Sequence, residues 1–275
     1  MVSTIDIRSQ AYNDYENSDY SDSDYGWVDI GDEDYLDVGG FWVGEYTILD
    51  DLPQTEGDTQ GFLDVFEENN WCISFDEGDE EVTAADFEES TTPETSDSVD
   101  IIWYDGHGNV GGLCLQGCWL GTTVDYTDIR WGNSDLEWAF LHACSTLAND
   151  YAPLNSYLKT NGYFAQSLKG IHMICGASTE MVSWSVETDG QYVAEFLTGT
   201  NRDLYTVKNA WFYGIAINAE ALLPFEDIEY INLRVIAEDE SYEDDYIWGQ
   251  STGPADDVAV DDYYYSWDYL IDPEE

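Results

Sequence analysis

Three near-continuous apolar runs in the middle of the chain constrain its fold most tightly. They are residues 99–104 (VDIIWY), 136–143 (LEWAFLHA) and 171–175 (IHMIC), and helical patterns lie between and after them. Strands that are apolar at nearly every position are buried on both faces, as in parallel sheets covered by helices. The pattern therefore predicts a three-layer α/β domain, with a mostly parallel central sheet flanked by helices on both faces.

The remaining segments complete one domain over residues 1–275, with a recognisable core at about 98–218. Acidic segments at residues 12–58 and 239–275 are predicted to be irregular. Further elements are predicted from hydrophobic periodicity: helices over 59–69, 83–89, 146–158, 163–168, 190–197 and 204–219, strands over 3–9, 71–75 and 229–238, and a hairpin-like stretch up to Gly132.

The charge balance excludes several kinds of partner. Seven Lys and Arg face 59 Asp and Glu, a formal net charge of −52, while aromatic residues still make up 15% of the chain. A chain with so few basic residues cannot make the phosphate contacts of nucleic-acid binding, and it is repelled by anionic membranes. The aromatic content predicts a folded protein, since disordered acidic chains lack such residues.

The same charge is typical of proteins adapted to concentrated salt. Self-repulsion destabilises a compact acidic chain at low ionic strength, whereas molar salt shortens the Debye length to about 3 Å. The sequence contains no apolar run of membrane-spanning length and no visible secretory signal. We therefore expect a cytoplasmic location in a salt-rich cell.

Five cysteines form an odd and scattered set, at positions 72, 114, 118, 144 and 175. Without a secretory signal, a disulfide framework is not expected. Cys114 and Cys118 have a spacing that could hold zinc, but no second matching pair accompanies them. We therefore predict no metal and no cofactor, and we keep a zinc protein based on this pair as an alternative.

Two of the predicted strands end in residues with catalytic potential. Asp105-Gly106-His107-Gly108 follows the strand at 99–104, and Cys144 follows the run at 136–143. Sites in parallel sheets lie at the carboxyl ends of strands. A cysteine peptidase needs a thiolate nucleophile, an imidazole and main-chain amides for the oxyanion, and these two strand ends would supply all three.

This arrangement resembles the caspase-like superfamily of cysteine peptidases, which includes caspases, legumain, gingipains, separase and the CHAT domains. The family pattern is an apolar block with His-Gly, a spacer, and an apolar block ending in Ala-Cys or Gly-Cys. Here it reads IIWYDGHG and LEWAFLHACST, and the downstream segments 168–181, 190–199 and 204–216 are most similar to the CHAT and separase-like arm. The resemblance covers about residues 98–218.

The resemblance implies a role for each of these residues. His107 would be the general acid and base, Cys144 the nucleophile, and Gly108 and Cys144 the donors of the oxyanion amides. A helix N-terminus just after Cys144 would favour the thiolate. Ser145 and Thr146 follow Cys144, where many family peptidases have a glycine.

Two other histidines lie within apolar strands. His142, two residues before Cys144, could compete as the base, but we interpret both His142 and His172 as core histidines. Because the superfamily includes members without peptidase activity, a catalytically inactive binding or scaffold domain is the alternative function.

Relatives that cleave after Arg or Lys have acidic S1 pockets, and those that cleave after Asp have basic ones. With seven basic residues in all, an arginine-built pocket is disfavoured, although Arg130 could form one. Acidic candidates for the S1 pocket follow the third strand: Glu180, Glu187 and Asp189. We therefore expect protein or peptide substrates cleaved after Arg or Lys.

Overall fold

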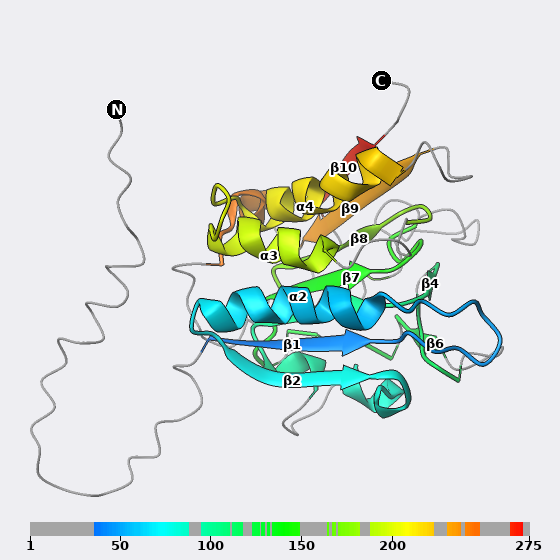
Figure 1. Cartoon of the computed structure of the whole chain (residues 1–275). Coiled ribbons are helices and arrows are strands. Elements are labelled where there is room, and N and C mark those ends of the chain that lie inside the picture. Colours follow the sequence, from blue (N-terminus) through cyan, green and yellow to red (C-terminus); the bar gives the residue numbers. More distant parts are fainter. Residues whose placement is uncertain are drawn as a thin grey trace, which may run out of the picture.

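A seven-stranded sheet forms the centre of the molecule, and three α-helices pack across one of its faces (Figure 1). The computed structural model describes residues 36–87, 95–110, 112–117, 123–126, 128–129, 131–132, 134–148, 164, 167–168, 170–181, 188–222, 230–237, 240–247 and 265–271. Every structural statement below concerns these ranges.

The strand order in the main sheet is β10–β9–β8–β7–β3–β1–β2. The strands from β2 to β8 in this order are parallel to their neighbours, whereas β9 pairs antiparallel with both β8 and β10. The bounds are β1 Asp37–Trp42, β2 Cys72–Gly78, β3 Ile101–Asp105, β7 Trp138–His142, β8 Met173–Ala177, β9 Ile231–Ala237 and β10 Tyr265–Ile271.

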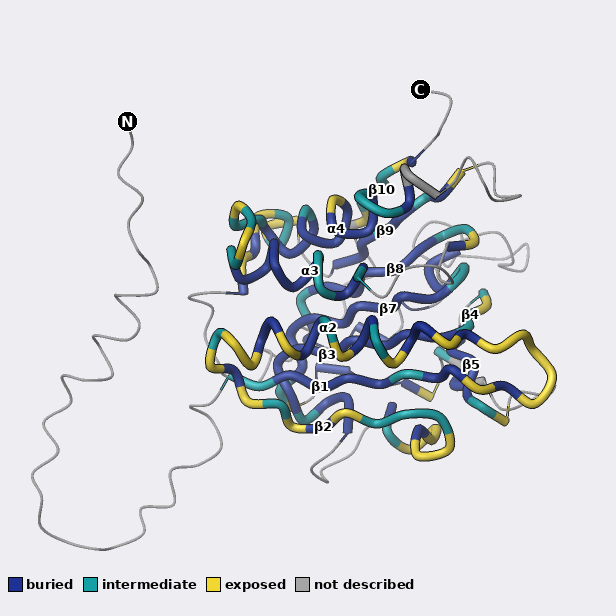
Figure 2. The backbone as a smooth tube through the Cα atoms, viewed as in Figure 1, coloured by how far each residue is buried: buried dark blue, intermediate teal, exposed yellow. Residues whose placement is uncertain are grey.

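The α-helices α2, α3 and α4 bury their apolar sides against one face of the sheet. The other face is covered by a second apolar cluster, to which a small sheet contributes Leu113 and Val124. Figure 2 shows that the central strands are buried throughout. The bounds are α2 Thr55–Glu68, α3 Asp189–Thr198, α4 Val207–Leu222, short 3₁₀ helices at Asp79–Glu81, Ala84–Asp86, Ser96–Ser98 and Glu240–Asp244, and small-sheet strands β4 Gly108–Asn109, β5 Gly112–Cys114 and β6 Thr123–Asp125.

Side chains alternate between the two apolar clusters along the central strands. In β3, Ile101 and Trp103 face the helices, while Ile102 and Tyr104 face the opposite side. β7 follows the same period of two, so the last residues of the two strands, Asp105 and His142, continue the helix-facing rows. They are also direct register partners.

The α/β class with a mostly parallel central sheet is confirmed. The helices seen in the described ranges cover one face of that sheet, and most of the predicted helix at 146–158 lies outside those ranges, as does the strand at 3–9. The prediction of irregular structure over residues 12–58 and 239–275 is wrong at β1, at the start of α2 and at β10. β1 was missed because DVGGFW lies in an acidic, glycine-containing stretch, yet four of its six residues are buried.

The described residues also bear on two expectations, the absence of a membrane-spanning helix and the absence of a disulfide framework. Within these residues, none of the helices combines the length and the hydropathy needed to cross a bilayer. The four described cysteines form no disulfide with one another: Cys72, Cys114, Cys144 and Cys175.

Candidate active site at the ends of β3 and β7

The two predicted catalytic segments lie side by side at the carboxyl ends of adjacent strands. β3 and β7 are paired in parallel, and Gly108 packs against the turn that contains Cys144. A Cβ atom added to Gly108 would lie 2.6 Å from the carbonyl oxygen of Cys144 and 2.9 Å from the Cβ of Ala143. Only glycine allows the main chain to approach so closely, so the His-Gly motif is a packing requirement of this site.

Two buried tyrosines fix the main chain of His107. Its amide donates to the Oη of Tyr46 at 2.8 Å, and its carbonyl oxygen lies 3.1 Å from the Oη of Tyr104. Both hydroxyls also lie within hydrogen-bond distance of the carbonyl of Cys114, at 3.3 and 2.8 Å. Burial raises the pKa of each tyrosine above its ordinary value, so both remain protonated donors.

The His107 ring lies beside the loop before α2. Its Nε2 is 2.8 Å from the carbonyl oxygen of Asp50, and its ring packs edge-on against Tyr46 with centroids 4.6 Å apart. Because a carbonyl oxygen can only accept, Nε2 is the donor, and the neutral ring carries its lone pair on Nδ1. Nδ1 is therefore the nitrogen able to act as a base.

The sulfur of Cys144 is partly buried beside the loop after β8. It accepts a hydrogen bond from the Met181 amide at 3.3 Å and lies 3.9 Å from the Met181 carbonyl oxygen. Burial raises the pKa of the thiol, and the negative charge of Glu180 acts in the same direction. Among the described residues, no hydrogen bond joins this sulfur to the His107 ring.

The chain after Cys144 forms a turn at residues 144–147, and no helix begins within residues 145–148. Ser145 has a left-handed φ of 57°, its amide donates to the carbonyl of Thr179, and the Leu147 amide donates to that of Ala177. The expected helix N-terminus directly after Cys144 is therefore absent from these residues. Among the described residues, the Cys144 amide donates no main-chain hydrogen bond.

The three acidic S1 candidates have different surroundings. Glu180 is exposed and lies in the loop whose next residue, Met181, contacts the Cys144 sulfur. Asp189 is buried at the start of α3, where its Oδ1 accepts from Asn218 at 2.6 Å and its Oδ2 faces His142. Glu187 and the alternative pocket residue Arg130 lie outside the described residues.

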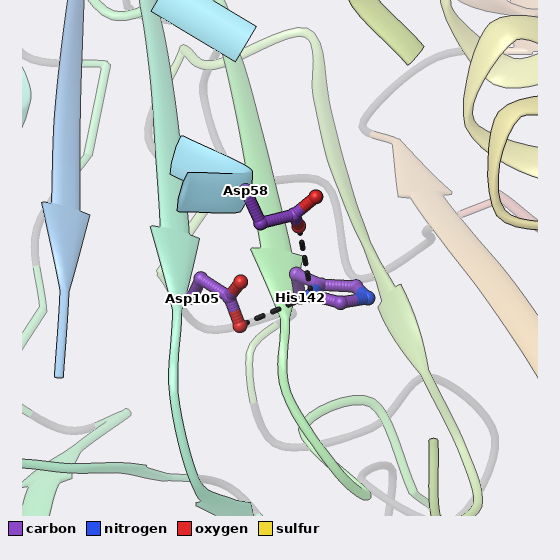
Figure 3. A group of neighbouring side chains, drawn as sticks. All are labelled: Asp58, Asp105 and His142. Atoms are coloured by element: carbon purple, nitrogen blue, oxygen red, sulfur yellow. Dashed lines mark ion pairs between the residues drawn. The ribbon is translucent and has the colours of Figure 1, made fainter. Parts of the chain in front are cut away.

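His142 is 1% exposed and lies in a cluster of carboxylates beneath the candidate site. Its Nδ1 lies 3.0 Å from Asp105 and 3.5 Å from Asp58, the two ion pairs drawn as dashed lines in Figure 3, and its Nε2 is 3.3 Å from Asp189. A ring enclosed in this way cannot reach a substrate, so His142 is a poor competitor to His107 as the base. The carboxylates were not predicted as partners of His142. Among 59 acidic residues, strand alternation marks only Asp105 as facing the helices, and no local pattern brings Asp58 or Asp189 to His142.

His172 is the second core histidine, and it also lies between carboxylates. Its Nε2 is 2.9 Å from Glu137 and its Nδ1 is 2.8 Å from Asp245, while its ring stacks on Tyr242 at 4.1 Å. Hydrogen bonds to Asp245 and Glu137 outweigh the cost of burial and raise its pKa to about 9. The interpretation as a satisfied core histidine agrees with these contacts.

Comparison with known proteins gives one family match. A family model described as "Domain of unknown function (DUF6345)" matches residues 41–269, which include both candidate catalytic residues. Comparison with curated proteins finds no match to the chain.

Solved structures with a similar arrangement are cysteine peptidases of low sequence identity. Gingipain R, an Arg-specific cysteine proteinase, has 9% identity and a TM-score of 0.46, over 74% of this chain and 55% of that chain. Caspase-1 from Spodoptera frugiperda has 15% identity and a TM-score of 0.43, over 67% of this chain and 80% of that chain. A complex of the Porphyromonas gingivalis RgpB pro- and mature domains has 12% identity and a TM-score of 0.40, over 82% of this chain and 50% of that chain. This chain therefore spans about half the length of the two gingipain chains.

Proposed function

The chain belongs to the DUF6345 family, and we propose that it is a cysteine endopeptidase with Cys144 as nucleophile and His107 as general acid and base. The observation that carries this proposal is the close packing of Gly108 against the main chain of Cys144. A Cβ atom added to Gly108 would lie only 2.6 Å from the Cys144 carbonyl oxygen. That contact holds the residue next to His107 against the main chain of the nucleophile.

The reaction follows from the positions of these groups. Burial favours the protonated form of the Cys144 thiol, so a base must remove its proton. We assign this role to His107, whose Nδ1 carries the lone pair that accepts the proton. The sulfur then bonds to the scissile carbonyl carbon, and the oxyanion is stabilised by the amides of Gly108 and Cys144. The C–N bond breaks as His107 returns the proton to the leaving amine, and water hydrolyses the resulting thioester.

For this reaction the His107 ring has to turn from Asp50 toward the substrate. Its main chain is held by Tyr46 and Tyr104, while the ring itself makes one hydrogen bond to the described residues, with a carbonyl of an exposed loop. Ile48 and Leu49 of that loop are 53% and 39% exposed. We assign them as apolar contacts for a peptide substrate bound beside His107.

Glu180 is our candidate for the S1 carboxylate, with cleavage after Arg or Lys. It is exposed, and its charge acts on the Cys144 thiol, so it lies close enough to attract a basic side chain at the scissile bond. Asp189 is buried beside His142. Glu187 remains the second candidate for the S1 carboxylate. The substrates would be proteins or peptides, and the reaction needs no cofactor.

The setting we propose is the salt-rich cytoplasm of a halophile. A net charge of −52 on 275 residues requires concentrated counterions to limit self-repulsion. Unfolding measured across rising KCl concentrations should show a large gain in the free energy of unfolding, and a salt-independent value would refute this setting. Activity assays therefore belong in molar KCl.

A non-catalytic scaffold is the second candidate, and one observation favours it. The His107 ring and the Cys144 sulfur each contact a main-chain group of a different loop, with no hydrogen bond between them. Incubation with acyloxymethyl ketones that carry Arg, Lys, Asp or Asn at P1 separates the two functions. A peptidase forms a thioether at Cys144 that His107→Ala suppresses, whereas a scaffold leaves Cys144 unmodified by the whole panel.

A further inference from the structure

From the cluster beneath the candidate active site we infer a binding site for one divalent transition-metal ion of the zinc type, with Asp58, Asp105 and His142 as ligands. The three residues come from different elements: Asp58 from the first turn of α2, and Asp105 and His142 from the ends of β3 and β7. One ligand atom from each lies within 4.8 Å of the other two (Figure 3).

Two of the three distances between the ligand atoms match the size of such an ion, and the third, between Asp58 and Asp105, is within 4.8 Å. With metal–ligand bonds of about 2.0–2.1 Å and tetrahedral angles, ligand atoms are separated by about 3.3–3.4 Å. His142 Nδ1 is 3.0 Å from Asp105 Oδ1 and 3.5 Å from Asp58 Oδ2. A small shift of side chains would therefore bring all three atoms to bonding distance of one ion.

Protein hydrogen bonds alone leave this cluster incomplete. Asp105 is 0% exposed, and among the described residues its Oδ1 has His142 Nδ1 at 3.0 Å while its Oδ2 has no hydrogen-bond partner. Asp58 Oδ2, at 3.5 Å from His142 Nδ1, accepts no hydrogen bond from the described residues. Nδ1 can carry at most one hydrogen, so it cannot donate to both carboxylates that face it.

Three buried carboxylates beside a single histidine also favour a bound cation. Even with His142 protonated, the three carboxylates of Asp58, Asp105 and Asp189 leave a net charge of −2 in a buried volume. Such a charge is not tolerated without compensation.

The groups around the three ligands are arranged as supporting partners. Asp58 Oδ1 accepts from the Gly190 amide at 2.9 Å, which leaves Oδ2 for the ion. His142 Nε2 faces Asp189 at 3.3 Å, and Asp189 is itself held by Asn218. A carboxylate that accepts from the second ring nitrogen orients a metal-bound histidine and fixes its tautomer. An imidazole with two carboxylates favours a zinc-type ion over Mg²⁺ or Ca²⁺, which prefer oxygen ligands.

The experiment uses the full chain in molar KCl, stripped with a chelator and titrated with Co²⁺ in the presence of excess Mg²⁺. The Mg²⁺ occupies exposed carboxylates, which are abundant in this chain. We expect uptake of one Co²⁺ per chain, a visible d–d band typical of nitrogen and oxygen ligands, and displacement by one equivalent of Zn²⁺ with a rise in the unfolding temperature. The rise follows from binding to the folded state alone.

Isosteric variants locate the ion. Asp105→Asn and Asp58→Asn should each weaken binding at least about tenfold, as loss of a ligand or its support does. The double variant Glu80→Gln/Glu81→Gln removes two exposed carboxylates and should bind as the wild type does.

Three results would overturn the assignment. They are no saturable uptake by the folded wild type, equal uptake by folded Asp105→Asn, and a thiolate-to-cobalt charge-transfer band, which would place the ion at a cysteine site. If the variants fail to fold, the stoichiometry and the spectrum of the wild type still decide the question. None of these readouts depends on peptidase activity.

Discussion

Gly108 lies against the carbonyl group of Cys144 so closely that a Cβ atom would be 2.6 Å from that oxygen. This contact joins the end of β3 to the turn after β7, and it fixes the distance between the two segments that we assign to catalysis.

Gly108→Ala is expected to disturb the site more than the fold. The added methyl group must displace the Cys144 carbonyl, and shifts of about 1 Å at a reacting centre can cost about a hundredfold in rate. We therefore expect kcat/KM, or the rate of Cys144 labelling, to fall by about ten- to a hundredfold. Gly214→Ala on α4, whose Cβ would meet Val193 at 2.5 Å, is the control for a packing defect elsewhere. Equal losses in the two variants would show that crowding at Gly108 has no special effect.

Tyr46→Phe removes the acceptor of the His107 amide but keeps the ring that packs on His107. An unsatisfied buried amide costs about 1–3 kcal/mol, so the free energy of unfolding should fall by about that amount. The labelling rate of Cys144 should fall as well, because His107 loses an anchor. Denaturant titration and labelling kinetics test both, with exposed Tyr230→Phe as the control. A loss of stability with an unchanged labelling rate would show that Tyr46 supports the fold but does not position His107 for the reaction at Cys144.

His172 should make stability depend on pH. Its pKa is raised to about 9 in the folded protein from 6.5, so its contribution is complete below pH 6.5 and is lost as the pH rises through about 9. The full contribution is at most about 3 kcal/mol, from the size of the shift. His172→Gln should flatten the decline in the free energy of unfolding over this range. Parallel curves for His172→Gln and the wild type would contradict the assignment.

Glu180→Gln should alter substrate preference without disabling the nucleophile. If Glu180 binds a basic P1 side chain, the variant should show a raised KM for Arg and Lys substrates, by about tenfold for a charge-assisted contact of about 1.5 kcal/mol. Substrates with an uncharged P1 residue should show only the smaller change that comes from removing the effect of Glu180 on the pKa of the Cys144 thiol. A panel of fluorogenic peptides in molar KCl measures this, and an equal effect on all peptides would exclude Glu180 from the S1 pocket.

The parts of the fold predicted from sequence are those with a strong hydrophobic period. β3 and β7 are buried at every position, and α2 and α3 were predicted to within about four residues of their observed ends. β1 was missed because Gly39 and Gly40, which allow Phe75 and Thr59 to pack closely, have no side chains that would reveal a strand. β10 lies in an acidic, tyrosine-rich tail that gives a weak alternating pattern.

The strand-end residues of the candidate site were predicted from the sequence, whereas the buried cluster around His142 was not. His107, Gly108 and Cys144 are marked by their places after apolar strands. The buried cluster could be detected only by extending the alternation of Trp103 to Asp105 and of Phe140 to His142, which puts both polar residues on the helix-facing side. Asp58 and Asp189 join them through the packing of α2 against α3, which no local pattern in the sequence reveals.

The central claim is that Cys144 is a nucleophile activated by His107. Mass spectrometry of the full chain after incubation with Arg- and Lys-directed acyloxymethyl ketones in molar KCl tests it most directly. We predict one modification, on Cys144, that is absent in Cys144→Ala and strongly reduced in His107→Ala. A folded wild-type protein that remains unmodified, or one labelled equally well without His107, would contradict the account.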